Sequence, residues 1–557
     1  MKKTIKNGTE WTVREGYEKI TDMFNPDDLL FDLNGKNHTL VKENRVRSVI
    51  SMPGSDINEN GIYIKYFKRG GCRDYIKHLF LPTKARTEWE VGNALLTKDI
   101  NTALPLAISE GKRRLLIVTE TVTNSEELMG FCQSNYEGSM SAEKESEKRI
   151  LLDKLAVFVR DIHEKGFCHY DLHAGNILIR FKKEQNVTGY DLYLMDLHRV
   201  KIFKSVSTNK RMFNFAQIFN SLSSIMTNAD KFDFVRSYGI NVLGNITDEH
   251  NLVKQIDGQS SRIRNVHYKS RRKRCLKESS VFSRRMIANM KIFFRKGYDT
   301  DRLHDLIEKH NSVLTNNDSA VIIKRDSKTA LTCHAFNDKT VQNVVVKQYR
   351  VGCPGCIIKN IFRGSAGRKA WVAGNGLRVY GLNTPLPLAL LEKKRFGVTT
   401  GSYVIMEEVK GRLEMDRYIL KNFNSRIDLK KKRAFINNLA NTLGKMHNHN
   451  IFHHDLKTCN IMVKEYEKMF NFTFLDFDKV SFRAEITIRK RVKNLIQINL
   501  STPRLFTLTD RLRFLREYLE QCGIMNEKKN ILREIVNISK VDKILYVSSQ
   551  GDVTEDW

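Results

Sequence analysis

Two stretches of the chain place apolar residues three or four positions apart, the spacing at which side chains share one face of an α-helix. Each stretch precedes a tripeptide that begins with histidine and ends with aspartate. The apolar positions are Leu151, Leu155, Phe158 and Ile162 in the first stretch, and Ile436, Leu439, Leu443 and Met446 in the second. We therefore expect a helix ahead of each aspartate-bearing loop.

Short apolar runs, rich in β-branched and aromatic residues, follow each of these loops. They cover residues 177–179 and 192–195 in the first half of the chain, and residues 461–463 and 472–475 in the second. Similar residues flank Lys65 and Lys347 further upstream. Runs of this length and composition predict strands. Each half should thus hold a lysine within a strand and a second aspartate at the end of a later strand.

The chain repeats itself. Residues 89–107 and 371–389 share Trp, Gly, Asn, Leu, Asn, Thr, Leu, Pro, Leu and Ala at a constant offset of 282 residues. The lysine strands keep this offset, and the later aspartates depart from it by only a few residues, as loop insertions would cause. A match of this kind over so short a window indicates a tandem duplication.

The duplication predicts the domain organisation. A chain of 557 residues is long enough for two large domains. We assign residues 1–260 to the first domain, residues 261–310 to a basic, partly helical linker, and residues 311–557 to the second domain. Within the linker, Ser279 to His310 has a helical pattern.

Composition and charge restrict the partners. Apolar residues make up 41% of the chain and charged residues 28%, which is typical of a globular protein, and the net charge is +31. Such a charge attracts nucleic acid, an anionic membrane surface or an acidic substrate. Positive charge is densest from Arg262 to Arg274, which fits a solvated linker and a surface-binding patch equally well. We expect no nucleic-acid partner, because neither aromatic stacking platforms nor a recognition motif is present.

No run of about 18 apolar residues occurs, and Met1 to Glu10 is polar and lysine-rich, so we expect neither a spanning helix nor a secretion signal. Nine cysteines without the spacing of a disulfide framework favour a reducing compartment. The sequence therefore predicts a cytoplasmic protein.

The loop after each predicted helix carries His-x-Asp-x-x-x-x-Asn. An aspartate at the head of such a loop can accept the proton of a substrate hydroxyl. The asparagine and the strand-end aspartate can hold Mg²⁺ at the phosphates of ATP. We assign the two bases as Asp171 and Asp455, and the metal ligands as Asn176, Asp196, Asn460 and Asp476. Each element alone is common, but their order, found twice, indicates metal-dependent phosphoryl transfer.

The strand lysine of such a site neutralises nucleotide phosphates, and a helix carboxylate orients it. Lys65 with Glu88 suits this arrangement in the first half. We also assign Glu120, Lys347 and Glu407 to nucleotide binding.

The two halves differ at the helix carboxylate. The offset of 282 residues places Ala370 opposite Glu88, beside the basic pair Arg368 and Lys369. We therefore expect Lys347 to lack an acidic partner. Because activity of this kind depends on positioning, the first half should be the more active.

These residues resemble a known family. The Lys65 strand and residues 89–107, 169–178 and 194–199, with their counterparts 371–389, 453–462 and 475–479, are similar to the lipopolysaccharide-core sugar kinases, the Kdo and heptose kinase family of bacteria. The resemblance implies an α+β fold of two tandem bilobal protein-kinase-like domains. It also implies ATP and Mg²⁺ as cofactors, with transfer of the γ-phosphate to a sugar hydroxyl of the lipopolysaccharide inner core, on Kdo or heptose.

The implied substrate is an anionic glycolipid or core oligosaccharide. The implied location is the cytoplasmic face of the inner membrane of a Gram-negative bacterium, with peripheral attachment. The positive charge fits this anionic surface, since each Lys or Arg near it contributes roughly 1 kcal/mol of attraction.

The sequence departs from a regulated protein kinase in three ways. Neither half has a glycine-rich phosphate loop, and the hairpins expected there, residues 42–48 and 324–330, are basic. Cationic side chains in place of backbone amides and plain exposed turns explain this equally well. Tyr170 and His454 stand before the catalytic aspartates instead of arginine, and no Ala-Pro-Glu follows. We expect no activation-loop switch.

Other functions fit parts of the pattern. A scaffold of kinase and pseudokinase copies would bind nucleotide or lipid without turnover, but both copies retain the base and the metal ligands. A protein kinase or an aminoglycoside-like phosphotransferase shares the His-x-Asp loop but lacks the repeated block at 89–107 and 371–389.

Overall fold

The computed structural model describes residues 1–6, 9–23, 38–43, 47–54, 58–68, 81–110, 114–138, 140–184, 187–239, 248–316, 318, 321–338, 341–351, 360, 364–423, 429–466, 469–548 and 551–555. The chain divides into two compact units, Met1–Val266 and His267–Trp557. The division falls inside helix α8 (Glu249–Arg272).

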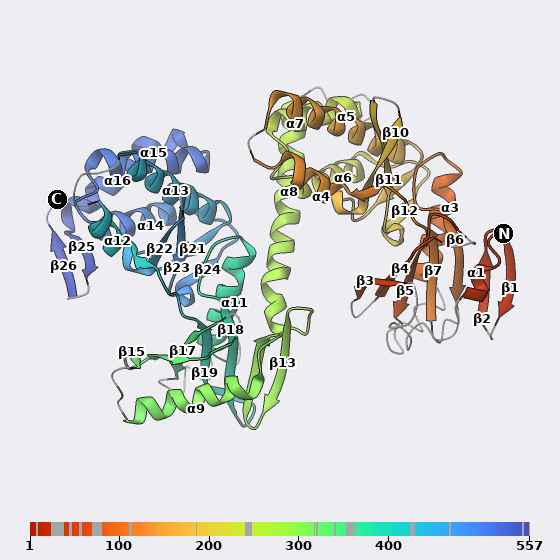
Figure 1. The fold of residues 1–557 in the computed structure, drawn as a ribbon. Helices are drawn as coiled ribbons and strands as arrows, with labels where there is room; N and C mark the ends of the chain where they lie inside the picture. Colours follow the sequence, from red (N-terminus) through yellow and green to blue (C-terminus); the bar gives the residue numbers. More distant parts are fainter. Residues whose placement is uncertain are drawn as a thin grey trace. The chain divides into compact units, whose positions relative to one another are not determined.

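The small lobe of the first unit is an antiparallel sheet of seven strands in the order β1-β2-β6-β7-β5-β4-β3 (Figure 1). Helix α3 (Lys84–Leu96) packs on β6 and β7, and α1 (Ile20–Met23) follows β2. The strands are β1 (Lys2–Lys6), β2 (Thr9–Val13), β3 (Thr39–Glu43), β4 (Arg47–Met52), β5 (Ile62–Lys68), β6 (Pro105–Glu110) and β7 (Arg114–Glu120).

The large lobe of the first unit is mainly helical. Its helices are α4 (Leu128–Tyr136), α5 (Ala142–Glu164), α6 (Thr208–Ser221), α7 (Asn228–Tyr238) and α8. A three-stranded sheet, β11-β10-β8, and a two-stranded ribbon, β12-β9, lie among them. These strands are β8 (Ser125–Glu127), β9 (Phe167–His169), β10 (Ile177–Glu184), β11 (Val187–Leu194) and β12 (Val200–Ile202).

The second unit repeats the small lobe with the strand order β13-β14-β18-β19-β17-β16-β15. Helix α11 (Ala366–Val379) takes the place of α3, and α9 (Thr300–Asn316) packs on β16 and β17. The strands are β13 (Phe282–Ile287), β14 (Met290–Arg295), β15 (Ile322–Arg325), β16 (Thr329–Ala335), β17 (Asn343–Arg350), β18 (Pro387–Arg395) and β19 (Val398–Glu407).

The large lobe of the second unit follows the same plan and adds a C-terminal hairpin. Its helices are α12 (Met415–Asn422), α13 (Leu429–Asn448), α14 (Ile488–Ser501), α15 (Leu508–Cys522) and α16 (Lys528–Val541). Its strands are β20 (Leu413–Glu414), β21 (Ile451–His453), β22 (Ile461–Tyr466), β23 (Met469–Phe474), β24 (Val480–Phe482), β25 (Ile544–Ser548) and β26 (Gly551–Glu555). The predicted fold of two tandem bilobal protein-kinase-like domains is confirmed.

The predicted helices and strands are present. The helical stretches lie in α5 and α13, whose apolar faces are buried, and the short apolar runs lie in β10, β11, β22 and β23. Lys65 lies in β5 and Lys347 in β17.

The helical prediction for Ser279 to His310 is wrong in its first half. Residues 282–295 form the hairpin β13-β14, and helix begins only at Thr300. The reason is tertiary: β14 pairs along its length with β18, so the hairpin completes the sheet of the second unit. Pairing of this kind overrides local helical spacing. We therefore propose that the second domain begins at β13 instead of at residue 311.

Glycine explains part of the repeated block. A Cβ on Gly92 would lie 2.7 Å from Cγ of Pro105, and one on Gly374 would lie 2.8 Å from Cγ of Pro387. The helix can approach the first residue of the next strand this closely only without a side chain. The glycine and the proline that recur in both copies of the block are therefore explained by the close packing of the helix on this strand.

Both large lobes bury the same polar cluster around a histidine. His163 contacts the Tyr238 hydroxyl at 3.0 Å and Oδ1 of Asn214 at 2.9 Å. His447 contacts Tyr518 at 2.6 Å and Asn494 at 3.1 Å in the same way. Burial lowers the pKa of each histidine to about 4, so both are neutral near pH 7.

Within the described ranges, no helix is both long enough and apolar enough to cross a bilayer. The basic stretch from Arg262 to Arg274 forms the last part of α8 and the 3₁₀ turn after it. The arginine and lysine side chains exposed there are those of Arg262, Lys269, Arg271, Lys273 and Arg274.

Candidate active sites

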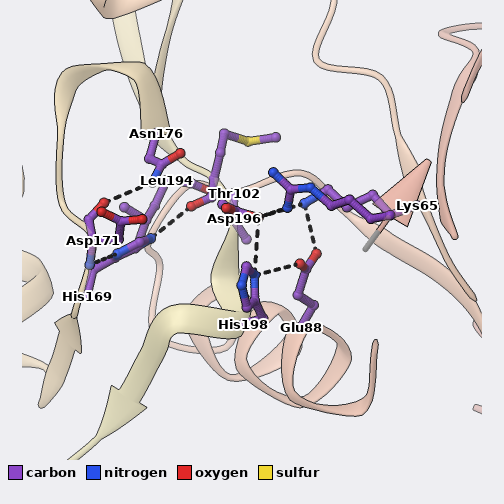
Figure 2. A network of polar contacts seen from close by, with 11 residues as sticks. Lys65, Glu88, Thr102, His169, Asp171, Asn176, Leu194, Asp196 and His198 are labelled. Carbon is purple, nitrogen blue, oxygen red and sulfur yellow. Dashed lines mark hydrogen bonds and ion pairs between the residues drawn. The ribbon is translucent and has the colours of Figure 1, made fainter. Parts of the chain in front are cut away.

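Successive side chains of β5 point to opposite faces of the sheet, and this explains how Lys65 reaches Glu88. Ile62 and Ile64 face the core of the sheet, so Lys65 shares the other face with Phe67, which packs beside Trp89 of helix α3. Nζ of Lys65 lies 2.9 Å from Oε2 of Glu88, and both side chains are largely buried (Figure 2). The structure brings together the predicted lysine and helix carboxylate.

Asp196 lies at the centre of the first site. Its Oδ1 is 2.5 Å from the guanidinium of Arg47, 3.2 Å from Nδ1 of His198 and 3.8 Å from Nζ of Lys65 (Figure 2). His198 also lies 3.3 Å from Oε1 of Glu88. Three basic side chains thus surround two carboxylates.

The charges of this cluster support one another. Burial works against ionisation of Asp196, but His198, Lys65 and Arg47 hold its pKa well below the usual range. Burial likewise opposes the charges of Glu88 and His198, yet their ion pairs leave the pKa of Glu88 lowered and that of His198 raised. The ionised form of both acids is therefore favoured.

Asp196 has a left-handed backbone, with φ 58° and ψ 50°, and Asp476 has φ 43° and ψ 43°. Few residues other than glycine adopt this region, and aspartate and asparagine are the ones enriched there. The same unusual backbone conformation at these two aspartates, both predicted metal ligands, marks the two turns as equivalent.

The catalytic loop of the first unit is held by backbone contacts. Nδ1 of His169 accepts a hydrogen bond of 3.0 Å from the amide of Asp171, and its Nε2 lies 3.0 Å from the carbonyl of Met195. Burial lowers the pKa of His169 to about 4, which keeps it neutral. The side-chain amide of Asn176 donates a hydrogen bond of 2.8 Å to the backbone carbonyl of Asp171. The loop and the turn before Asp196 are thereby tied together (Figure 2).

The second unit reproduces this loop. The amide of Asp455 donates to Nδ1 of His453 at 3.2 Å, whose Nε2 lies 3.1 Å from the carbonyl of Leu475. Asn460 donates to the carbonyl of Asp455 at 2.9 Å. Asp171 and Asp455 are both half-buried, so their carboxylates are accessible to a substrate.

The repeated block connects each small lobe to the turn that carries the predicted metal-ligand aspartate. The hydroxyl of Thr102 donates to the carbonyl of Leu194 at 2.7 Å, and that of Thr384 donates to the carbonyl of Phe474 at 2.9 Å. Leu194 and Phe474 each stand two residues before the aspartate that is the predicted metal ligand. The Asn-Thr of the block therefore holds the strand that presents this aspartate.

In the second site Lys347 has two acidic partners, which corrects the expectation that it would have none. Nζ of Lys347 lies 2.9 Å from Oδ1 of Asp476 and 2.8 Å from Oδ1 of Asp478. Burial would lower the pKa of Lys347, but these two acids leave it raised. Ala370 is buried and offers no charge.

The basic residues beside Ala370 do not oppose Lys347. Arg368 forms an ion pair with Glu392 at 2.5 Å, as Arg86 does with Glu110 in the first unit. Lys369 is exposed to solvent.

Sequence reasoning missed Asp478 and His198. Each stands two residues after a predicted metal-ligand aspartate, Asp478 in Asp-Phe-Asp and His198 in Asp-Leu-His. The sequence did contain a signal for Asp478. The second half has no carboxylate on its helix, and it carries an acid at this position instead of the histidine of the first half.

Glu120 and Glu407 occupy equivalent strand ends, opposite Ile62 and Val344. Oε1 of Glu120 accepts hydrogen bonds from the amides of Asn58 at 3.0 Å and Asn60 at 3.1 Å. The structure therefore places these two glutamates at the rim of each sheet, apart from the lysine clusters.

The predicted phosphate-loop hairpins are described in part. Residues 44–46 lie outside the described residues, but Arg47 begins β4 and reaches Asp196. In the second unit, Asp326 accepts hydrogen bonds from the amides of Lys328 and Thr329 at 2.8 and 2.6 Å. Lys328 and its neighbours Asp326 and Ser327 are exposed, so the second hairpin is a side-chain-stabilised turn.

The donor set at each site fits Mg²⁺. Each site offers an aspartate carboxylate and an asparagine side-chain oxygen, the hard oxygen ligands that this ion prefers. In the first site the amide nitrogen of Asn176 is engaged by the carbonyl of Asp171, which leaves its side-chain oxygen for other contacts.

Comparison with known proteins gives one family. The model of the lipopolysaccharide kinase (Kdo/WaaP) family matches residues 33–238 and again residues 323–518. A lipopolysaccharide core heptose(I) kinase WaaP of Pseudomonas aeruginosa is 24% identical over 236 residues, which cover 41% of this chain and 85% of that protein. Its Escherichia coli K12 namesake is 25% identical over 258 residues, or 44% of this chain and 95% of that protein.

Two solved structures are similar to part of the chain. A structure described as WaaP in complex with acyl carrier protein covers 45% of this chain and 98% of its own, at 22% identity and a TM-score of 0.35. An aminoglycoside-3'-phosphotransferase of type VIII covers 42% and 98%, at 15% identity and a TM-score of 0.28.

Proposed function

The chain belongs to the lipopolysaccharide kinase (Kdo/WaaP) family, which matches it twice, and on this premise we propose that it is an ATP-dependent sugar kinase. It transfers the γ-phosphate of ATP to a hydroxyl of the lipopolysaccharide inner core, on Kdo or heptose. The observation that carries this proposal is the cluster of Lys65, Glu88 and Asp196 beside the loop of Asp171 and Asn176.

In the proposed reaction each residue has one task. Lys65, held by Glu88, binds the phosphates of the nucleotide. Asp171 accepts the proton of the acceptor hydroxyl. As it does so, the oxygen of that hydroxyl forms a bond to the γ-phosphorus of ATP. The bond from that phosphorus to the bridging oxygen breaks, and ADP leaves. Asp455 performs the same step in the second unit, with Lys347 at the phosphates.

Asn176 and Asp196, and in the second unit Asn460 and Asp476, would hold Mg²⁺. The ion neutralises charge on the phosphates when it is bound. Arg47 lies 2.5 Å from Asp196 and is a further cation where phosphates would gather. We assign Glu120 and Glu407, at the strand ends, to the border of the nucleotide site.

The acceptor is an anionic glycolipid or core oligosaccharide, and the enzyme acts at the cytoplasmic face of the inner membrane. The net charge of +31 and the exposed basic residues between Arg262 and Arg274 support a peripheral, charge-based attachment. The family match supports the lipopolysaccharide class of acceptor over a protein or an aminoglycoside.

The experiment is an acceptor test. The full chain is incubated with γ-labelled ATP and Mg²⁺ in the presence of core oligosaccharide, a protein mixture or an aminoglycoside, with an Asp171→Asn, Asp455→Asn double variant as the control. We expect label on the oligosaccharide, lost in the variant. Label on protein or aminoglycoside would replace the proposed acceptor, and nucleotide binding without any transfer would favour the scaffold.

A further inference from the structure

The two sites hold their lysines with acids from different elements. In the first, Glu88 on α3 contacts Lys65, and His198 stands two residues after Asp196. In the second, the helix position is Ala370, and the acid Asp478 stands where the first site has histidine.

Each lysine nevertheless contacts two carboxylates. Lys65 lies 2.9 Å from Glu88 and 3.8 Å from Asp196. Lys347 lies 2.8 Å from Asp478 and 2.9 Å from Asp476. The pairing has therefore been kept although the sequence position of the second acid has changed.

The exchange also balances charge. If Asp478 were added to a site that kept its helix glutamate, three acids would surround one lysine, and like charges in a buried site repel. The first site holds Glu88 and Asp196 with His198 and Arg47, whereas the second has Thr329 at the place of Arg47. Among the described residues of the second site, Lys347 is the cation in contact with both acids, and Lys324 adds an electrostatic contribution to Asp476.

The source of the acid changes what holds the lysine. Glu88 comes from the small lobe, on the same side of the site as the strand of Lys65. Asp478 comes from the turn of the large lobe that also presents Asp476. Lys347 is therefore fixed directly to the metal-binding turn, and its side chain is only 8% exposed, against 15% for Lys65.

We propose that Asp478 is the positioning residue of the second site, where it replaces the helix carboxylate and keeps Lys347 available to nucleotide phosphates when Asp476 binds metal. The proposal rests on the proposed kinase function. It makes the second unit a nucleotide site in its own right, with its lysine oriented independently of helix α11.

The test isolates the second site in the full chain. An Asp196→Asn background weakens metal-dependent binding in the first unit, and calorimetry with ATP at several Mg²⁺ concentrations then reports the second. Asp478→Asn should weaken Mg²⁺-dependent ATP binding by about 10- to 100-fold, the usual effect of losing a supporting contact of this kind. The Mg²⁺ concentration at half-saturation should rise, because Lys347 would then pair with Asp476 alone and compete with the ion. Asp478→Glu should restore part of the affinity.

An exchange variant tests the positioning role of Asp478 by a gain of Mg²⁺-ATP binding instead of a loss. Asp478→His with Ala370→Glu recreates the arrangement of the first site and should bind Mg²⁺-ATP more tightly than Asp478→His alone. The mirror pair, Glu88→Ala with His198→Asp in an Asp476→Asn background, is the matched control. Thermal unfolding of each variant separates loss of the site from loss of the fold.

Two results would overturn the proposal: unchanged Mg²⁺-dependent ATP binding in Asp478→Asn, or no such binding by the second unit when Asp478 is intact. Neither readout needs an acceptor. If ATP binding follows Asp478 as expected but no sugar is phosphorylated, the positioning role stands and the proposed acceptor fails instead.

Discussion

The hydroxyl of Thr102 donates a hydrogen bond of 2.7 Å to the backbone carbonyl of Leu194. Thr102 belongs to the block that repeats most closely between the halves, and Leu194 lies two residues before Asp196. This bond joins the segment leading into β6 to the end of β11, so it links the small lobe to the turn of the large lobe that carries Asp196.

Replacing Thr102 with valine should therefore affect the reaction more than the fold. The variant keeps the shape of the side chain and loses one buried hydrogen bond, which costs about 1 kcal/mol of stability. We expect kcat to fall by about tenfold, because small displacements of catalytic groups are costly. Thr97→Val, which removes an exposed hydrogen bond at the C-terminal end of helix α3, is the control. Equal effects of the two variants on kcat would contradict the coupling.

Loss of the base should separate chemistry from binding. Asp171→Asn should lower phosphoryl transfer by the first unit by about 10²- to 10⁴-fold, since a positioned base contributes that much. ATP affinity should change little, because the base acts on the acceptor. Rates and nucleotide binding measured for Asp171→Asn, Asp455→Asn and the double variant check this. Unchanged turnover in the double variant would exclude both aspartates.

Gly92→Ala should destabilise the first unit. The new Cβ would lie 2.7 Å from the ring of Pro105, and overpacking of this kind costs about 2 kcal/mol. Gly130→Ala in α4 is the matched control, because no atom lies within 4 Å of its added Cβ and alanine stabilises a helix by about 1 kcal/mol. Urea unfolding should move the two midpoints in opposite directions.

Acid should weaken the fold through its buried histidines. The folded-state pKa of His163 and of His447 is about 4, below the ordinary value of 6.5, so unfolding takes up protons. Their stabilising effect is complete above about pH 6.5 and is lost as the pH falls towards 4. His198, with a raised pKa, acts in the opposite direction, but His169 adds to the loss.

Urea unfolding at pH 7 and pH 5 tests this expectation, because ordinary carboxylates remain ionised over most of that interval. The midpoint should fall by an amount equivalent to about 2 kcal/mol for each histidine whose pKa is lowered in this way. A midpoint that stays constant would contradict a net destabilising effect of the buried neutral histidines.

Binding to anionic vesicles should depend on salt. The Debye length falls from about 10 Å at 0.1 M to about 3 Å at 1 M, so attachment through exposed charge should weaken strongly. Changing Lys269, Arg271, Lys273 and Arg274 to glutamine should reduce binding at low salt, with exposed lysines of α16 changed as the control. Binding that persists at 1 M salt would point to a hydrophobic anchor.

Most of the contacts in the candidate site could be predicted because its residues lie in short sequence motifs that follow one another in a fixed order. Lys65 and Glu88 could be paired from a strand lysine and a helix carboxylate, and the catalytic loop from its spacing. The acid of Lys347 could not be found by the constant offset, since Asp478 reaches the same lysine from another element. The contact of Arg47 to Asp196 exists only once the lobes are assembled, so the sequence could name its basic hairpin but not this partner. His198 was missed although it lies two residues after Asp196 in the same turn, because a histidine at that position has no assigned role in the motif.

The hairpin β13-β14 was missed for a similar reason. Its pairing with β18 joins segments about a hundred residues apart, and no window of local periodicity contains that information. The counterpart in the first unit, β1-β2, gave no help because the first strand pairs share little sequence identity.

The left-handed backbone at Asp196 and Asp476 has an evolutionary consequence. Such a turn on its own would accept glycine or asparagine as readily as aspartate, or more readily. A copy that drifted without constraint on its chemistry could have exchanged the charge for either of these residues at no cost to the turn. Both halves have instead kept the carboxylate, so what has been retained at each position since the duplication is its negative charge.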